Sequence, residues 1–172
     1  MGEPDGFQAF VLARSAALLR TARMLTGDHA SAQDLVQTAL VKSWRRWNSI
    51  SPGAEEAYVR RAMISTFLSW RRRRWTGETP VANIPNPTLV GDAFAEVDTR
   101  AVVATALRGL TAKQRAVIVL RFVNDLSETD TALALNCSVG TVKSQTSRAL
   151  SNLRRSPLRY LFAEEESSNG LV

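Results

Sequence analysis

Apolar side chains recur at intervals of three and four residues along most of this chain. One stripe runs from Phe7 to Leu25, a second from Ala32 to Trp47 and a third from Val59 to Trp70. This spacing matches one face of an α-helix, and no segment alternates apolar and polar residues as a half-buried strand does. The hydrophobic share of 45% is enough for a buried core. The predicted fold class is therefore all-α.

A proline-containing connector interrupts the helical pattern. Pro80, Pro85 and Pro87 lie within twelve residues, and repeated prolines disfavour helix. Net charge changes at the same place: it is +6 over residues 1–75, −3 over 76–101, +6 over 102–161 and −3 over 162–172. We predict two small helical domains, residues 1–75 and 102–155, joined by a flexible acidic linker, residues 76–101. The acidic tail, residues 156–172, has the composition of a disordered end. Two basic modules indicate a polyanionic partner.

The second module carries the signature of a helix-turn-helix. Thr111 and Ser127 are each followed three residues later by Gln or Asp, a capping-box pattern that marks a helix start. Asn136 suits a tight turn and Ser138 an N-cap, so the last helix begins at Val139. Its inward stripe leaves polar residues on the other face, which suit base edges and phosphates of a major groove: Thr141, Lys143, Ser144, Gln145 and Arg148. An ordinary solvated helix face is the alternative.

Two motifs in register resemble a known family. The run from Gln114 to Arg121, followed by Val139 to Ser144, is similar to region 4 of bacterial sigma-70 type initiation factors, and the run from Ala32 to Leu40 resembles region 2.2. The length, with no counterpart of regions 1.1 or 3, resembles the extracytoplasmic-function (ECF) group. The resemblance implies a sigma factor that binds core RNA polymerase and directs promoter-specific initiation, and it implies that the helix-turn-helix reads the minus-35 element.

The resemblance also implies two sets of site residues in the first module. Core polymerase would be bound by Asp34, Gln37, Thr38 and Val41, of which Asp34, Thr38 and Val41 share a helical face with Gln37 at its border. A solvated face is again the alternative. The minus-10 element would be recognised and melted by an arginine-rich helix: Tyr58, Arg60, Arg61, Ser65, Ser69, Arg71, Arg72 and Arg73. Arginines neutralise phosphates and aromatic rings stack on unpaired bases. Trp44, Trp47 and Trp70 are expected in the core instead, while Tyr58 and Trp75 stay open between the two roles.

One departure from the family pattern concerns specificity. Ser65 and Ser69 stand where many members of the ECF group have Asn and Asp. Because the shorter side chains alter reach, the minus-10 sequence read by this chain cannot be copied from better-known members.

Other functions fit the sequence less well. A stand-alone helix-turn-helix regulator would leave the motif from Asp34 to Leu40 unexplained. An enzyme is disfavoured, since Cys137 and His29 form no plausible pair and no carboxylate cluster suggests a metal; neither metal nor cofactor is expected. The acidic N-terminus is unlike a signal peptide and no stretch is long enough for a membrane span, so we expect a cytoplasmic protein without membrane insertion. An anti-sigma factor is a common further partner in the group, although no residue of this sequence indicates one.

Overall fold

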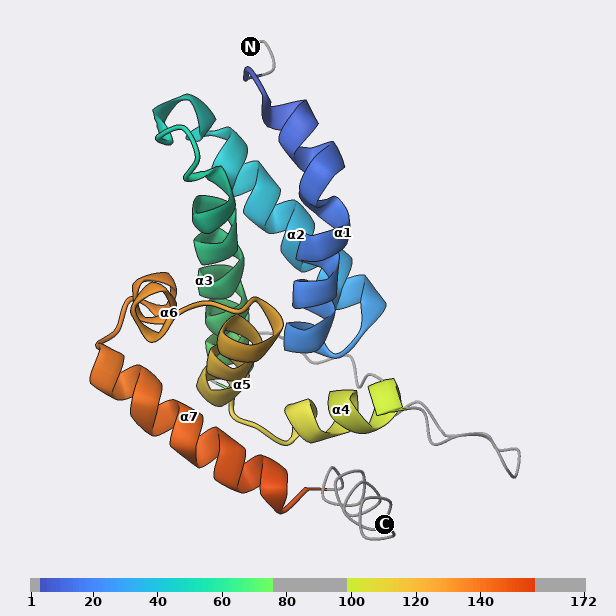
Figure 1. The fold of residues 1–172 in the computed structure, drawn as a ribbon. Helices are drawn as coiled ribbons and strands as arrows, with labels where there is room; N and C mark the ends of the chain where they lie inside the picture. Colours follow the sequence, from blue (N-terminus) through green and yellow to red (C-terminus); the bar gives the residue numbers. More distant parts are fainter. Residues whose placement is uncertain (1–3, 76–98, 157–172) are drawn as a thin grey trace, which may run out of the picture.

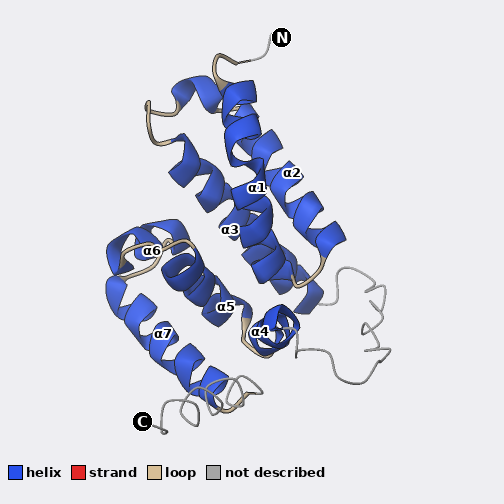
Figure 2. Cartoon of the chain, turned by 45° about the vertical axis from the view of Figure 1, so that its right-hand side comes forward, coloured by secondary structure: helices blue, strands red, loops and turns tan. Residues whose placement is uncertain are grey.

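The computed structural model describes residues 4–75 and 99–156, and every regular element in these ranges is helical (Figures 1 and 2). The elements are α1 (Phe7–Thr26), α2 (His29–Trp44), η1 (Trp47–Ser49), α3 (Glu55–Trp75), α4 (Thr99–Arg108), α5 (Ala112–Ile118), η2 (Val119–Val123), α6 (Glu128–Leu135) and α7 (Val139–Arg154). The all-α prediction is confirmed. Most of the predicted linker and tail, residues 76–98 and 157–172, lies outside the described residues.

The first module is a bundle of α1, α2 and α3. Gly27 ends α1 with φ 85°, and its N–H donates to the carbonyl of Arg23, as the glycine in that position predicts. Asp28 caps α2 through the backbone N–H of Ser31. The three apolar stripes meet in a core that includes Leu25, Leu35 and Phe67. The expected helices of this module are therefore present.

One boundary in this module differs from the sequence expectation. The second stripe was expected to continue to Trp47, yet α2 ends at Trp44 and Trp47 begins the short 3-10 helix η1. Tertiary contacts explain the change. The Trp47 ring meets Phe7 edge-on with centroids 4.9 Å apart, and its Nε1 donates to the carbonyl of Asp5 at 3.0 Å. Trp47 is buried as expected, whereas Trp44 and Trp70 are half-buried against the core.

The second module contains the expected helix-turn-helix. Thr111 and Gln114 form a complete capping box at the start of α5. At α6 the Ser127 side chain accepts from the Asp130 N–H, but the Asp130 carboxylate accepts the Ser127 hydroxyl at 2.6 Å, so this start is a single N-cap. Asn136 takes a left-handed conformation, φ 51°, in the turn before α7. Ser138 then caps α7 through the N–H of Thr141.

The two modules pack against each other. Figure 2 shows α4, α5 and α6 next to the bundle of α1 to α3, with α7 on their outer side. Ala116, Val119 and Leu120 of the second module belong to the same hydrophobic core as Leu25 of the first. Met24 of α1 also packs on the smaller core around Leu107 and Ala149. The sequence predicted two modules, and the structure adds that they share one core.

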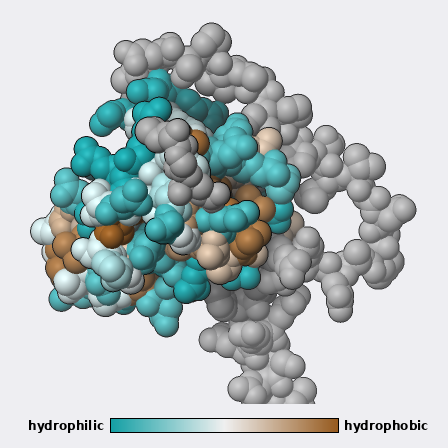
Figure 3. All heavy atoms as spheres, turned by 90° about the horizontal axis from the view of Figure 1, so that it is seen from above, coloured by the Kyte–Doolittle hydropathy of each residue, from teal (hydrophilic) through white to brown (hydrophobic). Residues whose placement is uncertain are grey.

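The described surface seen from above is mostly polar (Figure 3). Figure 3 shows hydrophilic residues over much of one face, interrupted by small apolar patches. Among the described residues the exposed large apolar side chains include Val41 at 55% and Leu133 at 58%. No helix in the described part of the chain is long and apolar enough to cross a lipid bilayer.

Candidate nucleic-acid interface

The outward face of α7 presents polar groups on a rigid support. Val142 and Ala149 are fully buried, which fixes the rotation of the helix about its axis. Thr141, Ser144 and Arg148 are consequently exposed, as predicted, while Gln145 is half-buried. Exposed Lys143 lies 3.7 Å from the Glu128 carboxylate at the start of α6. This partner draws Lys143 towards α6.

A continuous stripe on α3 carries most of the predicted minus-10 residues. Tyr58, Arg61, Ser65, Ser69 and Arg72 follow one another at intervals of three or four residues, and all five line one groove. Arg61, Ser65 and Arg72 are exposed, whereas Tyr58 and Ser69 are half-buried. The helix thus presents hydroxyls, guanidinium groups and one aromatic ring on a single face.

The remaining arginines of α3 lie in different surroundings. The Arg60 guanidinium is held by the Glu56 carboxylate at 2.7 Å, away from the stripe. Arg71 lines the groove, and burial together with the neighbouring Arg74 lowers the pKa of Arg71 below its ordinary value. Arg73 is exposed and lies outside the groove lining. The predicted set is therefore split, with Arg60 already engaged in an ion pair.

The predicted core-binding residues form a patch on α2. Asp34, Gln37 and Val41 are exposed and Thr38 is half-buried. Val41, with 55% of its surface exposed, supplies an apolar contact point among polar neighbours. The face predicted from helical spacing is present on the surface.

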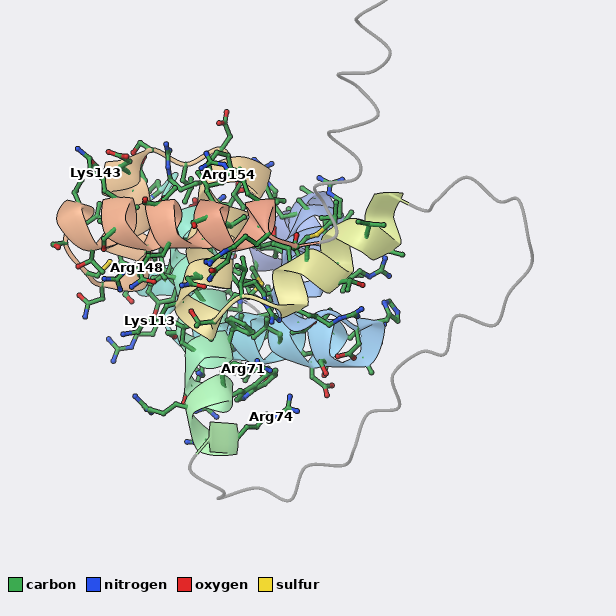
Figure 4. All side chains as sticks on the ribbon, turned by 90° about the horizontal axis from the view of Figure 1, so that it is seen from below. Arg71, Arg74, Lys113, Lys143, Arg148 and Arg154 are labelled. Carbon is green, nitrogen blue, oxygen red and sulfur yellow. The ribbon has the colours of Figure 1, made fainter. Side chains whose placement is uncertain are left out.

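The groove brings the two predicted DNA-facing helices together. It has a volume of about 1370 Å³ and is lined by α3 on one side and by α5, α6 and α7 on the other. Gln145 and Arg148 of α7 face it together with the α3 stripe. Figure 4 shows Arg148, Lys113 and Arg71 in succession from α7 to α3, whereas Lys143 and Arg154 lie towards the ends of α7.

Sequence reasoning did not include three cations of this groove. Lys42, Arg74 and Lys113 line it, although none of them was among the predicted site residues. Lys42 reaches from α2 to the Thr66 hydroxyl of α3 at 2.7 Å. Arg74 adjoins the predicted arginine run and was within reach of pattern reasoning. Lys113 lies in the other module, and only the packing of the modules places it near α3.

Polar contacts also join the two modules behind the groove. Arg115 is 2% exposed, and its Nη1 donates to the Leu25 carbonyl at the end of α1 at 2.7 Å, while its Nη2 donates to the Arg108 carbonyl at 3.0 Å. Burial, with Arg71 and Arg108 nearby, lowers the pKa of Arg115 to about 10. The Asn124 Nδ2 donates to the Thr21 hydroxyl at 2.9 Å.

The described residues contain no group of three or more His, Cys, Asp or Glu side chains placed to hold a metal ion. An arginine-rich helix that faces a helix-turn-helix across a cationic groove defines a two-module protein that binds nucleic acid.

Both modules match described families. Residues 10–76 match sigma-70 region 2 and residues 100–153 match sigma-70 region 4. The RNA polymerase sigma-E factor of Streptomyces coelicolor is 43% identical over 155 residues, which cover 90% of this chain and 87% of the relative. The ECF RNA polymerase sigma factor SigL of Mycobacterium tuberculosis is 34% identical over 146 residues, 81% of this chain and 82% of the relative.

Solved structures agree with the sequence relatives. The sigma factor RpoE of Bartonella quintana, solved with the anti-sigma factor NepR, superposes with a TM-score of 0.70 and 28% identity over 88% of this chain and 96% of that chain. CnrH, solved with the cytosolic domain of CnrY, shares the fold with a TM-score of 0.61 at 24% identity. The chain belongs to the sigma-70 family: it is a sigma factor of the ECF type, which binds core RNA polymerase and directs transcription initiation at promoters.

Proposed function

We propose that the α3 stripe and the outward face of α7 divide promoter recognition between them. Tyr58, Arg61, Ser65 and Ser69 would recognise and melt the minus-10 element, with Arg60, Arg71, Arg72 and Arg73 contributing charge. Thr141, Lys143, Ser144, Gln145 and Arg148 would read the minus-35 element. One observation carries this proposal: the α3 residues lie on one face of the helix and line the same groove as Gln145 and Arg148. Hydroxyl, amide and guanidinium groups are the donors and acceptors used in both kinds of contact.

The α2 patch is proposed as the surface for core polymerase. Asp34, Gln37, Thr38 and Val41 combine charge, an amide and an exposed apolar side chain, and none of them lines the groove. Core polymerase and DNA would therefore bind to different surfaces of the first module.

Promoter binding requires the two modules to separate. The names of the two elements place them about 25 base pairs apart, which is roughly 85 Å of duplex at about 3.4 Å per base pair. In the packed arrangement Arg148 and the α3 stripe face one groove, so one promoter cannot satisfy both. We infer that core polymerase holds the modules apart, with residues 76–101 as the linker between domains 1–75 and 102–155 and residues 156–172 as a tail.

The chain would act as a binding subunit in the cytoplasm and not as an enzyme. Its relatives are sigma factors, and their partner is the polymerase. An anti-sigma factor is proposed as a further partner because RpoE, at 28% identity, was solved with one.

Transcription in vitro tests the proposal. Purified core polymerase and genomic promoter fragments are incubated with and without the chain, and transcript starts are mapped. Start sites that depend on the added chain are expected. A variant with Arg61→Ala and Ser65→Ala should lose open-complex formation on duplex promoters while keeping core binding. Unchanged open complexes with this variant would remove the α3 assignment, and regulation of an already active holoenzyme would indicate a stand-alone regulator.

A further inference from the structure

The groove between the modules contains an excess of positive charge. Its lining includes Lys42, Arg61, Arg71, Arg72, Arg74, Lys113 and Arg148, and none of the described residues that line it is acidic. No carboxylate of a described residue lies within 4.0 Å of Arg61, Lys113 or Arg148. Like charges held together in a partly buried space repel each other, and the pKa of Arg71 is lowered first by burial and then by the neighbouring Arg74. An anionic occupant would relieve this repulsion.

The groove also has an apolar portion. Leu133 of α6 is 58% exposed there, beside Leu68 of α3 and Leu135 of α6, which are half-buried against the core. A phosphate backbone would satisfy the cations but would leave the exposed surface of Leu133 uncovered. The better occupant is a segment that carries acidic and apolar side chains close together.

The acidic tail has this composition. Leu161 and Phe162 are followed closely by Glu164, Glu165 and Glu166, and the tail continues from α7, which itself lines the groove. Ser156 lies roughly 12 Å beyond Arg148 along the helix direction, at about 1.5 Å per residue, and the tail must cover this distance to return to the groove. From Ser156 to Glu164 it spans up to about 26 Å when extended, at about 3.3 Å per residue. The glutamates can therefore reach the groove cations.

We propose that the acidic tail occupies the groove in the free chain and there covers side chains that promoter DNA would contact. Tethering places the tail at an effective concentration of the order of millimolar, whereas DNA must be captured from solution. The tail would leave when core polymerase separates α3 from α7, because the groove then no longer exists. The inference rests on the proposed function for its regulatory meaning, but the docking itself does not.

Cross-linking in the full-length chain tests the docking directly. Phe162 is replaced by p-benzoylphenylalanine, the chain is illuminated without polymerase or DNA, and the linked peptides are identified by mass spectrometry. We expect links within one chain to groove residues such as Leu68 and Leu133. Links to other surfaces such as α1, or links between two chains whose yield rises with protein concentration, would overturn the proposal.

Matched variants separate charge from position. The three substitutions Glu164→Gln, Glu165→Gln and Glu166→Gln should abolish the links to the groove, whereas Glu→Asp at the same positions should preserve them. Glu78→Gln, Asp92→Asn and Glu96→Gln remove as many charges from the connector and should leave the links unchanged. Equal yields in the Gln and Asp variants would refute the electrostatic docking.

Competition with DNA is measured by fluorescence anisotropy of a labelled duplex and the free chain. If the tail occupies the groove about nine-tenths of the time, it weakens DNA binding roughly tenfold, and the triple Gln variant should recover that factor. Equal affinity of wild type, triple Gln and triple Asp chains would overturn the competition. Failure of the chain to direct transcription would instead refute the proposed function and leave the cross-links unaffected.

Discussion

The hydrogen bond from Asn124 to Thr21 tests whether the modules pack together in solution. Its atoms are 2.9 Å apart and belong to different modules, and the Thr21 side chain is 3% exposed. Asn124→Ala removes the donor and Thr21→Val removes the acceptor. The Thr21 hydroxyl also donates to the Ala17 carbonyl at 3.2 Å, so Asn124→Ala leaves it with a partner. A neutral hydrogen bond contributes about 0.5–1.5 kcal/mol net, and we expect a coupling of about 1 kcal/mol.

Part of the single-variant cost will be offset. The Asn124 Oδ1 is buried without a hydrogen-bond partner in the described structure, so its removal regains some free energy. A double-mutant cycle cancels this contribution, because it appears both in Asn124→Ala and in the double variant. Urea unfolding of the four full-length chains gives the coupling, provided that each shows one cooperative transition.

The same cycle has a functional readout. If core polymerase separates the modules, breaking this bond beforehand should raise the affinity for core by up to about fivefold, the equivalent of about 1 kcal/mol. A coupling below about 0.3 kcal/mol would mean that the contact is not formed in solution. Such a low coupling would refute the packing of the two modules in solution, and the family assignment would still hold.

Three further predictions concern α2 and α7. Asp34→Ala combined with Gln37→Ala should weaken binding to core polymerase without changing the urea midpoint, since both side chains are exposed, and Gln33→Ala on the same helix is the control. Core affinity equal to wild type would remove the docking assignment. Arg148→Ala should weaken binding to minus-35 DNA by about 1–3 kcal/mol if the guanidinium contacts a base. Arg154→Ala, at an exposed position near the far end of α7 (Figure 4), is the control. An equal loss of affinity for all DNA sequences would show that Arg148 contacts only phosphate. Val142→Ala should lower the free energy of unfolding by about 2 kcal/mol, because Val142 is fully buried, and a loss below about 0.5 kcal/mol in urea unfolding would contradict its place in the core.

Local structure followed from local signals. Several helix ends are set by hydrogen bonds between residues a few positions apart, namely those at Gly27, at Thr111 with Gln114, and at Ser138. These boundaries could therefore be predicted without knowledge of the fold. The face of α7 that carries Thr141, Ser144 and Arg148 follows from the apolar spacing alone. The end of α2 could not be predicted in this way, because contacts of Trp47 with Phe7 and Asp5 decide it.

Contacts between the modules were beyond sequence reasoning. Arg115 lies in the region 4 motif, but its bond to Leu25 crosses 90 residues of chain. No sequence pattern relates Lys113 to Arg71. The two residues line one groove only because the two modules share a core. By itself, the sequence determined the helices, their faces and the family, since periodicity, caps and motifs are local properties. Only the tertiary structure decided that the two predicted promoter-reading faces meet, because packing depends on the shapes of both modules together.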